Sequence, residues 1–256
     1  NVIKKNSKNI IVITEKKESD LFYLIKKFNL FFIHHRNYIG GRYSVISEVG
    51  AIPAILMGLN IFNFRSKIHS ILKERKFLKD SSIILSDIFI KKKLSNIILL
   101  NYDMRLEKFL FWYQQLLAES LGKQGKGLMP VISNSPKDYH SLLQLYLDGP
   151  KDKLFYIFNL ENKSSIKLNT KNYLKKNNIL HDKDLIKIKD SQKNALIKFF
   201  KEKKIPFREF IIKSCNESTM GELFSYFIIE TILIGWLIGI NPFDQPAVEQ
   251  VKKNTK

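Results

Sequence analysis

Short apolar runs alternate with helical patterns along most of the sequence. Residues 9–14 and 30–34 are continuous apolar runs, typical of parallel strands buried on both faces, and a helical pattern over about 19–28 separates them. Further strands are predicted at 96–101, 131–133, 154–159 and 207–212. Helices are predicted up to residue 59 after a glycine-marked turn at 40–44, and then over 62–79, 81–93, 105–121, 138–147 and 191–203. This alternation predicts an α/β fold in which helices flank parallel sheets.

The chain is expected to form two α/β sections, with a boundary between residues 60 and 95. Residues 161–189 are rich in Lys, Asn and Ser and lack periodicity, so this segment is predicted to be a long surface excursion. The most apolar run, 226–240, contains Glu230 and is shorter than a bilayer span requires, which predicts a buried helix and no membrane partner. The first residue is asparagine, so the natural protein is expected to start further upstream.

The composition separates several classes of function. With 45% hydrophobic residues, a chain of 256 residues has enough apolar side chains for a substantial core. The formal charge of +19 is spread along the whole chain and forms no basic stripe, which argues against a nucleic-acid partner. A basic protein nevertheless attracts small phosphorylated substrates.

Metal and nucleotide chemistry have no support in the sequence. Cys215 is the only cysteine, which excludes an intramolecular disulfide and a cysteine-based metal cluster in this sequence and fits a cytoplasmic location. The five histidines lack the spacing of a metal site. Neither a GxGxxG fingerprint nor a GxxxxGK[ST] loop occurs, so no metal or organic cofactor is expected.

One carboxylate has a position that indicates acid–base chemistry. Glu119 falls in the last turn of the apolar helix predicted over 105–121, before Gly122, a typical helix-ending residue. The negative end of the helix dipole disfavours a further negative charge there, which favours the protonated form and prepares the carboxyl group to exchange protons. The alternative is a solvated glutamate at a frayed helix end.

Four further side chains occupy positions typical of functional sites. Arg42 follows two glycines, which let the backbone turn tightly so that a guanidinium can approach an anion. His140 is placed in the first turn of a helix after a loop. Gln245 precedes a proline-initiated helix that carries Lys252. Each also has an ordinary alternative, as a surface ion pair, a packed histidine, a loop amide or a solvated lysine.

Four stretches of the sequence together resemble one family. They are GGRYSVISEVGAIPAILMG, WYQQLLAESLGK, DYHSLLQLYLDGP and INPFDQPAVEQVK, which are similar, in this order, to motifs of glucose-6-phosphate isomerase. The last stretch matches the C-terminal signature of that family at all its fixed positions. The resemblance covers most of the chain and is weakest over 161–189.

The resemblance implies two sugar-isomerase (SIS) domains, each with a flavodoxin-like three-layer architecture. Residues 1–80 would then be the remainder of the first domain, 81–240 the second domain, and 241–256 a C-terminal active-site helix. The reaction of the family is the reversible isomerisation of glucose 6-phosphate to fructose 6-phosphate, a step of glycolysis and gluconeogenesis. It needs no metal or organic cofactor.

The matching motifs also imply a role for two of the candidate residues in proton transfer. Glu119 resembles the base that carries a proton between C1 and C2 through a cis-enediolate. Arg42 resembles the arginine that stabilises the negative charge on this enediolate, a role that a fixed guanidinium fills well.

The remaining matches concern the sugar ring and the binding of the phosphorylated hexose. His140 and Lys252 resemble the pair that opens the ring. The counterpart of His140 comes from the second subunit, which implies a homodimer with shared active sites. Gln115 and Gln245 match amides that hold the substrate.

Two features depart from the family pattern. Glu48 occupies a place where the family usually has a small residue, and we interpret it as a tolerated variant near the site. The phosphate-binding loop of the family lies upstream of the strand equivalent to 9–14, but only NVIKKNSK precedes that strand here. A sheet cut in this way leaves an open apolar edge. The chain is therefore expected to be the C-terminal part of a longer isomerase.

Three alternatives remain open. A non-catalytic SIS module that binds a phosphosugar would need neither Glu119 nor the pair formed by His140 and Lys252. An inactive fragment that lacks the phosphate loop is the second alternative. Isomerisation of mannose 6-phosphate by the same fold is the third.

Overall fold

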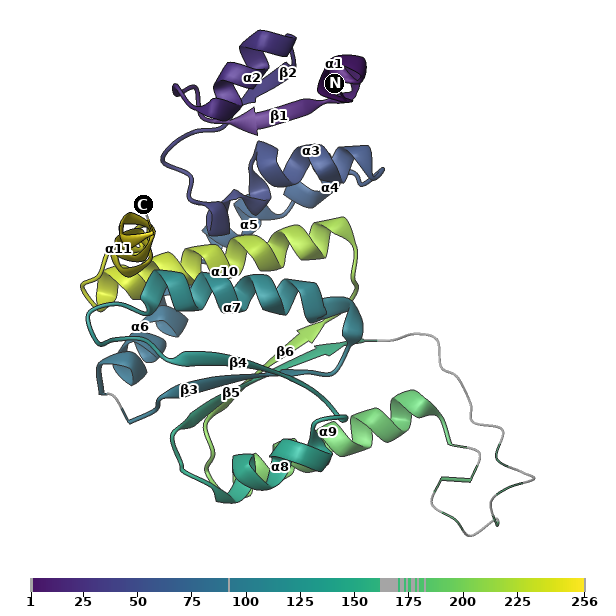
Figure 1. The fold of residues 1–256 in the computed structure, drawn as a ribbon. Helices are drawn as coiled ribbons and strands as arrows, with labels where there is room; N and C mark the ends of the chain where they lie inside the picture. Colours follow the sequence, from purple (N-terminus) through teal and green to yellow (C-terminus); the bar gives the residue numbers. More distant parts are fainter. Residues whose placement is uncertain are drawn as a thin grey trace.

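Two parallel β-sheets form the framework of the chain (Figure 1). A computed structural model describes residues 2–91, 93–161, 170, 173, 175, 178, 180–181 and 183–255. The smaller sheet pairs β1 (Ile11–Thr14) with β2 (Phe31–His34). The larger sheet has the order β4-β3-β5-β6, and its strands are β3 (Asn96–Asn101), β4 (Met129–Asn134), β5 (Lys153–Leu160) and β6 (Phe207–Ile212). All neighbouring strands are parallel.

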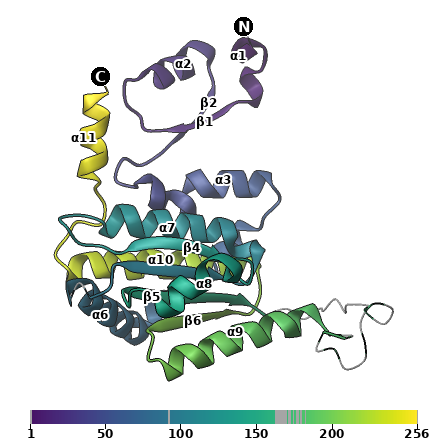
Figure 2. The same cartoon turned by 60° about the horizontal axis from the view of Figure 1, so that its bottom comes forward.

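Helices cover both faces of the larger sheet, which makes three layers (Figures 1 and 2). One face carries α6 (Arg75–Lys91), α7 (Glu107–Leu121) and α10 (Glu217–Leu237), and the other carries α8 (Tyr139–Asp148) and α9 (Leu185–Glu202). The remaining helices are α1 (Val2–Lys5), η1 (Ser7–Asn9), α2 (Asp20–Phe28), η2 (Gly41–Ile46), α3 (Glu48–Leu56), α4 (Ile61–Arg65), α5 (Ile68–Lys73), η3 (Met104–Leu106) and α11 (Pro246–Asn254). The predicted α/β fold, with parallel sheets between helices, is confirmed.

The two central strands are apolar along most of their length because each packs against helices on both sides. In β3, Ile97 and Leu99 contact the cluster under α7 and α10, whereas Ile98 and Leu100 contact the cluster under α8 and α9. All eight residues of β5 are buried. Continuous apolar runs therefore identify these strands better than an alternating pattern would.

The apolar helix α10 packs inside the chain. By length and composition alone it is apolar enough to cross a membrane, but half of its most apolar window is buried against other parts of the protein. It packs against α4, α6 and α7. Its Glu230 is 1% exposed and accepts a hydrogen bond of 3.0 Å from Arg208 of β6. The prediction of a buried helix is confirmed.

Two helical predictions need correction. The helices predicted at 62–79 and 81–93 are in fact α4, α5 and α6, because the chain bends twice to stay in contact with α10. The surface excursion predicted over 161–189 is wrong for its last residues. The helix α9 begins at Leu185, where the Asp184 side chain accepts from the Ile186 N–H. Most of the earlier part of that segment lies outside the described residues.

The smaller sheet is more exposed than predicted. Ile11 and Phe31, which start its two strands, are 41% and 63% exposed. The expectation that both faces would be buried is wrong here, because α2 supplies the main packing for this short sheet through Phe22 and Ile25. The β1–α2–β2 unit lies apart from the larger sheet, beyond α3 (Figure 1).

Candidate active site

Glu119 lies where the sequence predicts it, in the last turn of α7. Gly122 ends the helix, and its N–H donates to the carbonyl oxygen of Ala118 at 3.0 Å. A Cβ on Gly122 would lie 2.5 Å from that same oxygen, so only glycine allows this close turn. The Glu119 side chain is 30% exposed and lines a pocket of about 410 Å³ between the end of α7 and the start of α11.

Arg42 reaches Glu119 from η2. Its Nη1 donates to Oε2 of Glu119 at 3.2 Å, and its Nε donates to Oγ of Ser120 at 2.8 Å. Its Nη2 donates to the carbonyl oxygens of Pro242 at 2.6 Å and Asp244 at 3.1 Å. The guanidinium, whose side chain is 2% exposed, is therefore fixed between α7 and the loop before α11.

The two glycines before Arg42 do not act as the sequence predicted. Gly40 has a φ of −65° and an extended backbone, and Gly41 begins η2 with open space where a Cβ would stand. Neither adopts the left-handed conformation that favours glycine, so the predicted need for a tight glycine turn is wrong. Hydrogen bonds hold Arg42 instead. Its carbonyl oxygen accepts from Nε1 of Trp112 at 2.9 Å.

Tyr43 and Ser120, which were not among the candidate residues, complete this network. The Tyr43 hydroxyl lies 2.8 Å from Oγ of Ser120 and donates to the carbonyl oxygen of Pro242 at 2.9 Å. Burial raises the pKa of Tyr43, so the hydroxyl keeps its proton and remains a donor. Both residues directly follow a candidate, Arg42 or Glu119, in the sequence. This adjacency was the available signal.

Of the two predicted substrate amides, one contacts Glu119 and the other lines the pocket. Gln115, one turn before Glu119 in α7, donates from Nε2 to Oε1 of Glu119 at 3.0 Å. Gln245 is the N-cap residue of α11 and lines the same pocket. The structure thus brings together Arg42, Gln115, Glu119 and Gln245 from three separate segments.

The other two candidates lie elsewhere. His140 is exposed on α8, which covers the opposite face of the larger sheet from α7 (Figure 1). Lys252 is exposed on α11, and its Nζ donates to Oε1 of Glu249 at 2.8 Å. Within one chain, neither side chain reaches the pocket beside Glu119.

Glu48, which departs from the family pattern, has a local partner. Its Oε1 lies 2.6 Å from Nδ1 of His35, and Nε2 of His35 lies 3.0 Å from the carbonyl oxygen of Ile39. A hydrogen bond from its own backbone N–H and one from His35 lower the pKa of Glu48. The carboxylate therefore ties the loop after β2 to the start of α3.

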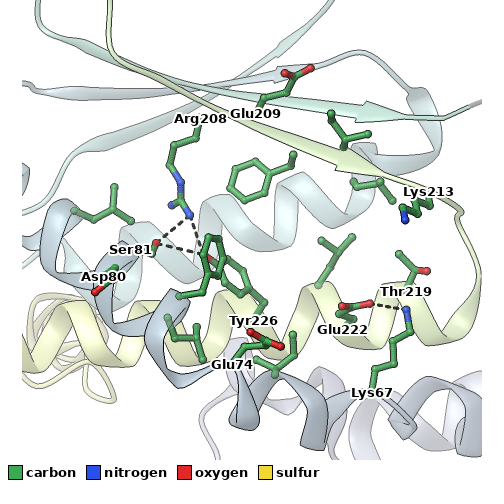
Figure 3. A pocket seen from close by; sticks show the side chains of 18 of the residues that line it. Lys67, Glu74, Asp80, Ser81, Arg208, Glu209, Lys213, Thr219, Glu222 and Tyr226 are labelled. Atoms are coloured by element: carbon green, nitrogen blue, oxygen red, sulfur yellow. Dashed lines mark hydrogen bonds and ion pairs between the residues drawn. The ribbon is translucent and has the colours of Figure 1, made fainter.

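A larger cleft of about 960 Å³ lies between α6, α10 and β6, but several of its polar groups bind each other. Figure 3 shows Arg208 pointing from β6 toward Ser81 and Tyr226. Both Nη atoms of Arg208 also donate to Glu230, so the guanidinium is already satisfied by the protein. Among the described residues, no group of three or more His, Cys, Asp or Glu side chains is arranged to hold a metal ion.

Fold and site together define a three-layer α/β protein with a carboxylate and a buried guanidinium paired at the end of a helix that covers the sheet. No protein-family model matches the chain. The glucose-6-phosphate isomerase of Mycoplasmopsis synoviae is 32% identical to it over 258 residues, which are 96% of this chain and 59% of that protein. A probable glucose-6-phosphate isomerase of Methanococcus maripaludis is 32% identical over 268 residues, with 99% and 59% covered.

Solved structures support the same fold. A hypothetical protein from Thermus thermophilus superimposes with a TM-score of 0.87 at 24% identity, covering 98% of this chain and 63% of that one. A glucose-6-phosphate isomerase from Chlamydia trachomatis has a TM-score of 0.72 at 15% identity, covering 96% and 51%. The resemblance to glucose-6-phosphate isomerase is therefore confirmed. The chain spans 59% of the length of the two curated relatives named above.

Proposed function

We propose that this chain is part of a glucose-6-phosphate isomerase and carries its proton-transfer residues. The observation that supports this most directly is the Arg42–Glu119 pair, in which Glu119 also accepts from Gln115 and shares a pocket with Gln245. The complete enzyme isomerises glucose 6-phosphate to fructose 6-phosphate reversibly, in glycolysis and gluconeogenesis, without a metal or organic cofactor.

In this proposal Glu119 is the base. Its carboxylate takes a proton from C2 of open-chain glucose 6-phosphate, which leaves a cis-enediolate. A proton then passes from the oxygen on C2 to the oxygen on C1, and Glu119 returns its proton to C1 to give fructose 6-phosphate. Gln115 holds Oε1 of Glu119, so the carboxylate keeps one orientation during both steps. The partial exposure of the Glu119 side chain leaves the carboxylate accessible from the pocket.

Arg42 stabilises the enediolate. A guanidinium has five N–H groups, and four of those of Arg42 go to Ser120, Glu119, Pro242 and Asp244 among the contacts of the described residues. One N–H on Nη1 is left for the negatively charged oxygen of the intermediate. A donor held in place before the reaction stabilises developing charge without reorganisation.

Ring opening is assigned to His140 and Lys252, and the position of His140 supports the proposal of a homodimer. His140 lies across the sheet from Glu119 of its own chain, so it can act only at the site of a second subunit. Lys252, on the exposed helix α11, is free to turn from Glu249 toward a sugar. The net charge of +19 favours a phosphorylated hexose as substrate.

We also propose a domain organisation and a location for the enzyme. Residues 1–80 form part of a first SIS domain, 81–240 form the second, and 241–256 form the C-terminal active-site helix. The enzyme is cytoplasmic and binds neither nucleic acid nor a membrane. The phosphate group is expected to bind to the part of the relatives that has no counterpart in this chain.

A coupled assay tests the function. Glucose 6-phosphate formed from fructose 6-phosphate is measured for this chain and for a version extended by the missing part of its relatives. Activity of the extended version alone supports the proposal and makes the present chain an incomplete catalyst. If both versions are folded and dimeric but inactive, a non-catalytic phosphosugar-binding module replaces the isomerase.

The role of Glu119 is tested with Glu119→Gln in the extended version. We expect the loss of proton exchange at C2, because an amide cannot take up the proton, while a competitive sugar-phosphate inhibitor still binds. Exchange is followed in deuterated water, and inhibitor binding by calorimetry. Retained exchange would remove Glu119 from its role as the base.

A further inference from the structure

Lys123 lines the pocket with a largely covered side chain, and no role has been assigned to it. It follows Gly122 directly after α7, and its side chain is only 9% exposed. Its Nζ donates to the carbonyl oxygens of Asn241 and Asp244 and, at 2.8 Å, to Oδ1 of Asp244. The three N–H groups of an ammonium thus meet three acceptors, all of them in the loop before α11.

The same loop is also held by Arg42. The guanidinium donates to the carbonyl oxygens of Pro242 and Asp244, so the Asp244 carbonyl accepts from both Arg42 and Lys123. Two cations that lie 81 residues apart in sequence therefore meet at one carbonyl oxygen. The position of this loop and the position of the guanidinium depend on each other.

The ammonium group of Lys123 is largely shielded from solvent and fully paired. A buried charge is costly unless it is paired and hydrogen-bonded, so its three contacts hold the loop in one arrangement. The hydrogen bond from Lys123 is the largest of the causes that lower the pKa of Asp244.

We propose that Lys123 is a positioning residue that sets Gln245 and Arg42 relative to Glu119. The residue after Asp244 is Gln245, which lines the same pocket as Glu119, and α11 with Lys252 follows. Lys123 acts through the loop and does not touch the reacting atoms. This inference rests on the proposed isomerase function for its kinetic consequence, although the anchoring of the loop does not depend on it.

The neighbouring lysine provides a matched control. Lys126 lies in the same turn after α7, and its Nζ donates to the carbonyl oxygen of Ile238 at the end of α10 at 2.6 Å. It makes no contact with the loop 241–245 among the contacts of the described residues. Lys123→Met and Lys126→Met therefore remove the same charge from the same turn, but only the first releases the loop.

Hydrogen exchange on the chain as it stands measures the anchoring. For Lys123→Met we expect amides of residues 243–254 to exchange at least about ten-fold faster than in the wild type, because charge-assisted hydrogen bonds are lost. Amides of β3 and β5 should be unchanged. Lys126→Met should leave residues 243–254 protected. Equal protection of this segment in both variants overturns the proposal.

A second variant guards against a general loss of folding. Asp244→Asn keeps the two carbonyl acceptors of Lys123 and removes only the charge of the third. We expect faster exchange of residues 243–254 than in the wild type, but less than in Lys123→Met. An effect of Asp244→Asn that equals or exceeds that of Lys123→Met contradicts the assigned role of the carbonyl contacts.

The kinetic consequence is measured in the version that shows isomerase activity. Lys123→Met should lower kcat and raise KM, each by about ten-fold, because Arg42 and Gln245 are no longer held in position relative to Glu119. For Lys126→Met both constants should stay within about two-fold of the wild type. Faster exchange with unchanged kinetics overturns the positioning role and leaves a structural anchor. A wild type that is folded but inactive overturns the proposed function, and the exchange comparison still decides whether Lys123 holds the loop.

Discussion

Arg42 donates to a carboxylate, a hydroxyl and two backbone carbonyls, although its side chain is almost fully buried. Taking a guanidinium out of water is costly, and its partners are costly to leave unpaired once the guanidinium is gone. The residue therefore has a structural role that any test of its chemical role must separate.

We predict that Arg42→Ala lowers the free energy of unfolding by about 3 kcal/mol, because buried partners lose their donor. In the active version, Arg42→Ala should reduce the turnover number more than it weakens substrate binding. The loss of transition-state stabilisation should be on the order of a few kcal/mol, as expected when a donor that stabilises developing charge is removed. Urea unfolding and steady-state kinetics measure the two effects. The exposed Arg36→Ala serves as the control and should change stability by less than about 0.5 kcal/mol.

The outcome that contradicts the chemical role of Arg42 is specific. If a folded Arg42→Ala enzyme turns over as fast as the wild type, the guanidinium only holds the loop before α11. Addition of free guanidine provides a further comparison, since it supplies the charge without the four fixed hydrogen bonds.

At the scale of elements, α10 organises the packing of the helices on its side of the sheet. The contact between α4 and α10 is close, because a Cβ on Gly221 would lie 1.7 Å from the carbonyl oxygen of Phe64. The rings of Phe64 and Phe224 lie 6.0 Å apart beside this contact. A glycine in a helix interior is normally unfavourable, so the close approach explains why it is present.

Gly221→Ala should therefore destabilise the protein by about 1–3 kcal/mol, because α4 must move away from α10. Helix propensity alone predicts the opposite sign, a gain of about 1 kcal/mol. Thermal unfolding followed by circular dichroism distinguishes the two. Gly41→Ala is the control, since a Cβ there meets open space. A higher melting temperature for Gly221→Ala would show that α4 adapts without loss.

Elements that are marked by a local sequence pattern could be predicted well. The strands predicted at 96–101 and 207–212 match β3 and β6. For β3 the reason is that a buried parallel strand is an apolar run with clear ends. The edge strand β6 contains Arg208 and Glu209 and is mostly only partly buried. The breaks between α4, α5 and α6 could not be predicted, because they depend on how the chain follows α10.

The same limit holds at the site. Glu119 and Arg42 lie in recognisable motifs, and the structure pairs them. The contribution of Lys123 depends on three acceptors more than 110 residues away in sequence, so no local pattern indicated it. The positions of His140 and Lys252 relative to the pocket also follow only from the folded chain.

On the scale of the whole molecule, carboxylates with lowered pKa values tie its parts together. Hydrogen bonds from Lys153 and Ser95 lower the pKa of Asp152 at the start of β5, and one from Lys123 lowers that of Asp244. A carboxylate with a lowered folded pKa contributes stability above its unfolded pKa and loses it as the pH falls.

Stability should therefore be nearly constant between about pH 6 and 8 and should fall below about pH 4, where these carboxylates become protonated. The net charge of +19 becomes larger in acid and adds self-repulsion. Urea midpoints measured across this range, at low and high salt, check both parts. A stability that rises on acidification would contradict the carboxylate assignments.

The hydrogen bonds of Arg42 have a consequence for the order of folding. They join positions 77 to 202 residues apart, whereas the larger sheet is built from strands connected by one helix or loop at a time. Contacts of such high sequence separation carry a large loop-closure entropy and form late. The pocket is thus expected to be among the last parts of the chain to assemble, after the sheet is complete. A refolding molecule with native strand pairing would for a time have a complete sheet but no assembled pocket, and so no catalytic activity.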